Sequence, residues 1–166
     1  MTARRPANAT NDFIEHIAIL LEAEGMARVA GRLFGVLLVS AEPRSLDELA
    51  EQLGVSKASV SINIRFLEEK GAVERIGRQG DRRDYYRIAD DMVERMLEQR
   101  LAKVRRFREA IGHARAACAA KHDSVRLRLA NVDAAYQHLL DVTERALDEW
   151  RGRKGTRGPR QTARSR

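Results

Sequence analysis

The sequence predicts a mainly helical (α+β) protein in which one small β-hairpin interrupts a series of amphipathic helices. Apolar residues recur at helical spacing over most of the chain, and only residues 73–88 alternate with the period of strands. The two helical stretches before this hairpin are separated by a tight Gly-Val-Ser turn at residues 54–56. Two helices joined in this way and followed by a hairpin form a winged helix-turn-helix. We expect helices that serve dimerisation to flank it on both sides.

The composition excludes several classes of protein. Of the 166 residues, 43% are hydrophobic, which is enough for a packed core. A single cysteine excludes an internal disulfide framework. No apolar run reaches the length of about 20 residues that spans a membrane, and the first residues lack the apolar stretch of a signal peptide. We therefore expect a cytoplasmic protein with no cofactor, and no arrangement of residues indicates an enzyme.

Charge is unevenly distributed along the chain. The formal net charge is +7, but residues 151–166 hold seven bases and no acid, so residues 1–150 sum to zero. Within this neutral part, residues 11–54 carry a net charge of −5 and residues 55–88 a net charge of +3. A positive segment inside a neutral body indicates nucleic-acid binding more specifically than a high pI does.

Two helices are expected at the start of the chain, after a short disordered lead over residues 1–10. The first helix runs from about residue 11 to Glu24, and Gly25 ends it. A second helix over about residues 26–40 is apolar on nearly all sides, which is typical of a central helix.

Two glycines lie one helical turn apart in this central stretch. Gly31 and Gly35 share a helix face, although each glycine lowers helix propensity by about 1 kcal/mol. Their place inside a helix argues against a phosphate-binding loop, in which glycines precede a helix. We interpret the pair as a packing device that lets another helix approach closely.

The helix-turn-helix is defined by its capping residues. Ser45 and Glu48 have the spacing of a capping box, Gly54 suits a left-handed helix end, and Ser56 can cap the next helix, which runs over residues 57–70. The apolar stripes then lie on the inner faces of both helices. They are Leu46, Leu49, Ala50 and Leu53 in the first helix, and Val60, Ile64 and Leu67 in the second.

The hairpin that follows completes the predicted domain over residues 11–89. Its strands are expected at residues 73–78 and 83–88, with a polar turn between them. Because side chains alternate along a strand, Tyr86 and Ile88 share one face, which we take as the inner one.

Residues 90–150 are predicted to form two long helices that mediate dimerisation. Apolar residues recur every seven positions in both helices, and a small winged helix cannot cover two such seams. A second copy of the chain would supply the missing surface. The residues 151–166 are expected to be a disordered basic tail. The expected dimer interface comprises Val93, Leu97, Val104, Phe107 and Ile111.

The second helix of the helix-turn-helix presents a face that fits the DNA major groove. Small residues there permit close approach, and Ser, Lys and Arg side chains can donate hydrogen bonds to base edges. Ile62 could contact a thymine methyl group; alternatively it is an isolated apolar surface residue, or the dimer helices cover it. The candidate residues on this helix are Ser56, Lys57, Ala58, Ser59, Ser61, Ile62 and Arg65.

The hairpin tip is the second candidate contact with DNA. Arg82 and Arg83 could enter a narrow minor groove, where negative potential is concentrated, and Arg78 lies nearby. Asp81 could orient a neighbouring guanidinium through a bidentate pair. The alternative interpretation is an ordinary solvated charged turn.

These motifs carry a family resemblance. The stretches GVSKASVSINIRFLEEKGAVERI (residues 54–76) and GDRRDYYRI (residues 80–88) resemble the winged helix of MarR-type transcription regulators, and AGRLFG (residues 30–35) resembles their GbsR branch. The resemblance covers about residues 12–118. It implies a homodimer that reads a pseudo-palindromic operator in double-stranded DNA. It places at the DNA Ser56, Lys57, Ser59, Ser61 and Arg65, with Arg82 or Arg83 at the wing.

Other candidate sites are weaker. Cys118 occupies a heptad core position, which favours a small apolar filler over a redox switch. His113, Cys118 and His122 do not share one helix face, so no metal site is predicted. GbsR-type regulators are associated with osmolyte genes, but the aromatic residues here lie on helical seams. We predict no specific small-molecule effector.

Three functional hypotheses follow from these observations. The first is a dimeric, sequence-specific DNA-binding regulator that acts as a repressor. The second is a winged helix used as a protein-interaction module. The third is a sequence-independent DNA binder driven by the basic tail. The positive charge of residues 55–88 and the wing arginines favour the first over the second.

Overall fold

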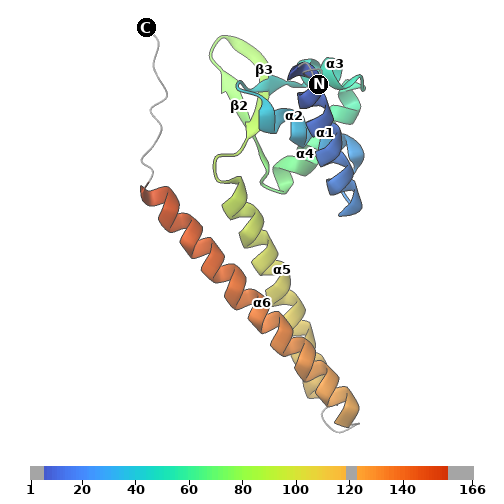
Figure 1. The fold of residues 1–166 in the computed structure, drawn as a ribbon, viewed down its shortest axis with the longest axis vertical. Helices are drawn as coiled ribbons and strands as arrows, with labels where there is room; N and C mark the ends of the chain where they lie inside the picture. The colour runs from blue at the N-terminus through green and yellow to red at the C-terminus, as the bar shows by residue number, and fades with distance from the viewer. Residues whose placement is uncertain (1–5, 119–122, 157–166) are drawn as a thin grey trace, which may run out of the picture. The chain divides into compact units, whose positions relative to one another are not determined.

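The computed structural model describes residues 6–118 and 123–156 (Figure 1). The chain divides into two compact units, the first ending at Arg95 and the second beginning at Met96. The first unit is a helical domain with a small sheet, and the second is a helical hairpin. None of the described helices combines the length and hydropathy of a membrane span. The elements are α1 (Pro6–Ala23), α2 (Arg28–Val39), β1 (Arg44–Ser45), α3 (Leu46–Leu53), α4 (Lys57–Glu69), β2 (Val73–Arg78), β3 (Asp81–Ile88), α5 (Met92–Cys118) and α6 (Asp123–Thr156).

The two glycines of α2 allow α1 to pack against its backbone. A Cβ atom at Gly31 would lie 2.8 Å from the Cα of Ala18, and one at Gly35 would lie 3.2 Å from the Cα of Ile14. No side chain fits at the shorter of these separations. The interpretation of Gly31 and Gly35 as a packing device is therefore confirmed.

The local signals that predicted the helix-turn-helix are present. Glu48 accepts a hydrogen bond of 2.7 Å from the main-chain N–H of Ser45, whose hydroxyl in turn accepts from the N–H of Glu48. Gly54 ends α3 at a φ of +65°, and Ser56 caps α4 by accepting from the N–H of Ser59 at 3.2 Å. The core of the unit contains the buried side chains of Leu33, Val36, Leu49, Val60, Ile64, Leu67 and Val73.

The sheet has three strands, not the two that the sequence predicts. The strand order is β1-β3-β2, and both neighbouring pairs are antiparallel. In β1, Ser45 pairs with Tyr85 while its side chain caps α3. A strand of two residues has no visible period, so the sequence pattern could not reveal it. The second strand of the hairpin also begins earlier than expected, at Asp81.

The second unit is formed by α5 and α6, which pack side by side in antiparallel directions. Its apolar core consists of Leu101, Val104, Leu140 and Leu147. The ring of Phe107 stacks on that of Tyr136, with centroids 4.3 Å apart. Asp133 forms ion pairs with Arg108 at 3.0 Å and with Arg115 at 2.7 Å. Apolar stacking and ion pairs therefore both join the two helices.

One residue predicted at the dimer interface has a different place in the structure. Val104 is only 7% exposed in the single chain, where it lies in the core shared by α5 and α6. A heptad shows that a partner helix is needed but not whether that helix belongs to the same chain. Phe107 is 42% exposed, whereas Val93, Leu97 and Ile111 are half-buried.

The predicted disorder at the two ends is wrong where the structure describes them. Residues 6–10 are helical rather than part of a disordered lead, because Pro6 suits the first turn of a helix and alanines continue it. Residues 151–156 continue α6, and Arg151 pairs with Glu98 of α5. Residues 1–5 and 157–166, the rest of the predicted lead and tail, lie outside the described residues.

Candidate nucleic-acid interface

The candidate contact face of α4 lies opposite its buried stripe. Val60, Ile64 and Leu67 are turned inward and at most 1% exposed, so the residues on the other side face solvent. Ile62 is 69% exposed, the largest value among the exposed large hydrophobic residues of the described chain. Of the other candidates on α4 and its cap, Ser56, Lys57, Ala58 and Arg65 are exposed, while Ser59 and Ser61 are half-buried.

The N-terminal turn of α4 offers both backbone donors and a cation. The first N–H groups of a helix lack intrahelical partners and favour anions. Ser56 satisfies one of them, the N–H of Ser59. The Nζ of Lys57 lies 2.8 Å from a carboxylate oxygen of Asp47 on α3, and both side chains are more than half exposed. Exposed ion pairs contribute little stability, so Lys57 can exchange Asp47 for a phosphate at small cost.

The wing contains a cluster built around Asp81. Its carboxylate accepts hydrogen bonds from the main-chain N–H of Arg83 at 2.9 Å, from Nη2 of Arg83 at 2.7 Å and from the hydroxyl of Tyr85 at 2.8 Å. Hydrogen bonds from the Arg83 side chain are the main reason that the pKa of Asp81 is held far below its usual range. The same contact raises the pKa of Arg83. The pair therefore stays ionised, and it fixes the Arg83 guanidinium.

Tyr85 forms the base of this cluster. Its ring is 3% exposed, with the guanidinium carbon of Arg78 4.1 Å and that of Arg83 5.4 Å from its centroid. Tyr85 lies on the face of β3 opposite that of Tyr86, and Tyr86 is the residue that the sequence predicts to face inward. The burial of Tyr85 on that face is explained by the arginine side chains that cover it. Residues 81, 83 and 85 occupy alternate positions of β3 and so share one face. The sequence prediction placed Asp81 in the turn and missed Tyr85, although this spacing could have revealed the cluster.

Arg82 differs from its neighbours on the wing. Arg83 is bound to Asp81, and Arg78 lies 3.7 Å from a carboxylate oxygen of Glu42. The exposed side chain of Arg82 points from the opposite face of the strand and has no ion-pair partner among the described residues. It is therefore the wing arginine whose charge is most available to an approaching phosphate.

The winged helix matches a known family. Residues 24–84 match the sequence model of the MarR family. The matched segment includes the whole of α4 and β2 and the first half of β3, and thus every candidate DNA-contacting residue, whereas Tyr85 lies just beyond it.

Curated relatives match about half of the chain. The HTH-type transcriptional regulator MmpR5 of Mycobacterium tuberculosis is 41% identical over 78 residues, which are 46% of this chain and 47% of that protein. The HTH-type transcriptional repressor OpcR of Bacillus subtilis is 31% identical over 84 residues, which are 51% of this chain and 45% of that protein. The chain thus spans about half the length of the curated relatives that it matches.

A solved structure resembles most of the fold. A crystal structure described as a transcriptional regulator is 27% identical, with a TM-score of 0.75 over 87% of this chain and 99% of that one. The likeness therefore reaches beyond the winged helix into the C-terminal helices.

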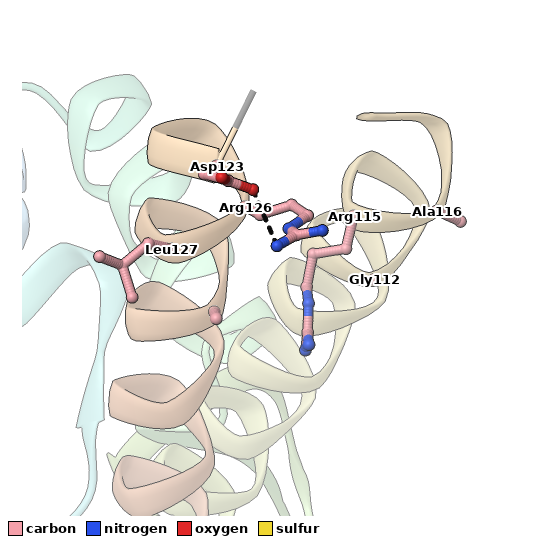
Figure 2. A pocket seen from close by; sticks show the side chains of 7 residues that line it. Gly112, Arg115, Ala116, Asp123, Arg126 and Leu127 are labelled. Carbon is pink, nitrogen blue, oxygen red and sulfur yellow. Dashed lines mark ion pairs between the residues drawn. The ribbon is translucent and has the colours of Figure 1, made fainter. Parts of the chain in front are cut away.

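A separate hollow lies in the second unit (Figure 2). It has a volume of about 780 Å³ and is bordered by Arg115 and Arg126. Both arginines are already paired, Arg126 with Asp123 at 2.9 Å and Arg115 with Asp133. Leu127, one of the residues that line it, is 64% exposed, so the hollow is open to solvent on that side. Its guanidinium groups are neutralised, and it is not part of the candidate interface.

The weaker candidate sites gain no support from their surroundings. His113 is exposed and Cys118 is half-buried, while His122 lies outside the described residues. Within residues 6–118 and 123–156, no three His, Cys, Asp or Glu side chains gather in a way that could hold a metal ion.

Proposed function

We propose that this protein is a sequence-specific, DNA-binding transcription regulator that acts as a homodimeric repressor on a pseudo-palindromic operator. The recognition helix (residues 56–70) would lie in the major groove and the wing (residues 72–88) in the minor groove. Support comes from the match to the MarR family and from relatives that are named transcriptional regulators or repressors. The AGRLFG motif favours a GbsR-like member, and a cytoplasmic location fits this role.

The exposed face of α4 is the observation that carries the proposal. An isoleucine that is 69% exposed at the centre of a face of small polar residues is unfavourable in water. Against DNA, Ile62 can contact a thymine methyl group while Arg65 donates to a guanine. No described residue covers this face, so a partner that offers apolar methyl groups and hydrogen-bond acceptors, as DNA bases do, fits it.

Dimerisation would supply the second half-site. A pseudo-palindromic operator requires two recognition helices related by a two-fold axis. The exposed apolar residues of α5 and α6 are candidates for the contact between chains, since apolar side chains in such number favour burial. They include Met96, Phe107, Val142 and Trp150.

The proposal is tested by measuring DNA selection directly. The full chain is equilibrated with duplexes from the region upstream of its own gene and from a random library, near physiological salt and with excess competitor DNA. Enrichment of one inverted repeat, bound by two chains, is the expected result. Binding that the competitor abolishes for every duplex would instead support a sequence-independent binder. No binding at all would support the protein-interaction module.

A further inference from the structure

Arg32 joins three helices of the first unit. It belongs to α2, and its Nε lies 2.6 Å from Oε1 of Glu15 on α1. Its Nη1 donates a hydrogen bond of 3.2 Å to the main-chain carbonyl of Leu53, the last residue of α3. The side chain is 27% exposed, less than most arginines of the unit that form ion pairs. One guanidinium thus connects α1 to the end of α3.

The contact with Leu53 satisfies a need at the end of α3. The last carbonyls of a helix lack intrahelical partners, and the negative end of the helix dipole favours a cation. The amides of Gly54 and Val55 bond to carbonyls about one turn earlier in α3, not to that of Leu53. The last turn of α3 contains no basic residue. Arg32 of α2 therefore provides both the donor and the charge.

The position of Glu15 depends on the close packing of α1 on α2. Gly31, next to Arg32, admits the backbone of Ala18 to a distance at which no Cβ atom fits. Ile14, beside Glu15, is buried against Gly35. With α1 held this closely, the Glu15 carboxylate lies within ion-pair distance of the Arg32 guanidinium.

We propose that Arg32 is a positioning residue for DNA recognition: it ties α1 to the turn between α3 and α4 and so sets the direction in which α4 presents its exposed face. Leu53 stands three residues before Ser56, the cap of α4. A shift of the Leu53 carbonyl therefore moves the first turn of α4. This inference rests on the proposed function, because the effect that it assigns to Arg32 is an effect on DNA binding. Arg32 itself is not among the proposed DNA contacts.

Arg28 provides a matched control on the same helix. It also pairs with Glu15, at 3.0 Å, and with Glu22, at 3.3 Å, but both of these partners belong to α1. Replacing Arg28 removes the same charge and an ion pair with the same carboxylate, Glu15, together with the ion pair to Glu22. Only the Arg32 replacement removes the contact with the Leu53 carbonyl.

The test compares full-length wild type, Arg32→Met and Arg28→Met on the duplex that the wild type selects from a random library and on a scrambled duplex. Affinities are measured at a temperature where circular dichroism shows every variant folded. Arg32→Met should bind the selected duplex about tenfold more weakly than Arg28→Met does, which is the effect expected from the loss of one hydrogen bond from a charged group. The two variants should bind the scrambled duplex with equal affinity. Equal affinities of the two variants for the selected duplex would overturn the proposal.

Hydrogen exchange separates this inference from the proposed function. In the free protein, Arg32→Met should accelerate exchange of the amides of residues 54–57, and Arg28→Met should leave it unchanged. If the wild type selects no sequence, the proposed function fails, and equal exchange in the two variants would then refute the positioning role as well. Should Arg32→Met not fold, Arg32→Lys replaces it, because one ammonium cannot reproduce both guanidinium contacts.

Discussion

Asp81 and Arg83 form a bidentate pair on one face of β3, in which Nε and Nη2 of the arginine both donate to the carboxylate at 2.7–3.1 Å. Together with the hydroxyl of Tyr85, this pair makes the wing a preformed structure rather than a loose turn. It also distinguishes the two neighbouring arginines. The guanidinium of Arg83 is bound to Asp81, whereas Arg82 has no ion-pair partner in the part of the chain that the structure describes.

Replacing Asp81 should weaken operator binding. Asp81→Ala releases Arg83 and Tyr85, so the wing loses its fixed shape, and we expect the affinity for the operator to fall several-fold. Loss of a negative charge near DNA would by itself raise affinity. Asp84→Ala is the matched control, because Asp84 pairs only with Arg75 among the described residues, at 3.3 Å. Anisotropy titrations in which both variants bind equally well would contradict a role for the wing pair.

Replacing Arg82 should weaken binding to all sequences alike. If its free guanidinium contacts phosphates, Arg82→Ala should lower the slope of log affinity against log salt by about 1 and leave the choice of operator unchanged. Titrations at several salt concentrations on operator and scrambled duplexes measure both quantities. A loss confined to the operator would show instead that Arg82 reads the shape of one particular minor groove.

Replacing Arg65 should change the choice of sequence. Arg65→Ala removes a donor from the exposed face of α4, and we expect a cost of about 1–3 kcal/mol at one base position, with relaxed preference there. Lys70→Ala removes a cation at the end of α4, where Lys70 lies over the ring of Phe66, and should leave the preference intact. Selection from a library randomised at each operator position would reveal the change, and an unaltered profile would remove Arg65 from base recognition.

The glycine contact between α1 and α2 can be tested by stability alone. A methyl group at Gly31 would lie 2.8 Å from the Cα of Ala18, so Gly31→Ala should destabilise the fold by about 1–3 kcal/mol. Gly112 on α5 has open space around it, and Gly112→Ala should stabilise by up to about 1 kcal/mol through helix propensity. Denaturant unfolding measures both. Equal effects of the two alanines would show that α1 can move away at no cost.

The basic tail should add affinity without specificity. Residues 151–156 belong to α6, so the informative truncation ends the chain at Thr156. It removes residues 157–166, which contain four arginines and no acid. We expect the shorter chain to show a flatter salt dependence and the same operator preference. Loss of operator preference in the truncated protein would place sequence recognition, at least in part, in the tail.

The sequence predicted those features of the fold that depend on local signals. Ser45 with Glu48, Gly54 and Ser56 each specify a helix end through a few neighbouring residues, and the structure confirms all of them. The exposed face of α4 followed from the position of its buried stripe, because helical geometry leaves no freedom between the two.

Features that depend on contacts distant in sequence could not be predicted in this way. The hydrogen bond from Arg32 crosses 21 residues to reach Leu53, and no periodicity encodes such a contact. The heptads required partners for α5 and α6, yet they did not show that Val104 is buried within its own chain. The two residues of β1 were too few to display the alternation of a strand.

The brief β1 strand has a consequence for how such a protein could acquire a new target sequence. Ser45 connects β1 to β3 and caps α3, while β2 follows α4 through a short turn, so the sheet is attached to both helices of the helix-turn-helix by main-chain geometry. The angle between α4 and the wing is therefore independent of the side chains that α4 exposes. In the proposed complex with DNA, substitutions at Ile62 or Arg65 would alter the preferred bases and leave the spacing between the major-groove and minor-groove contacts unchanged.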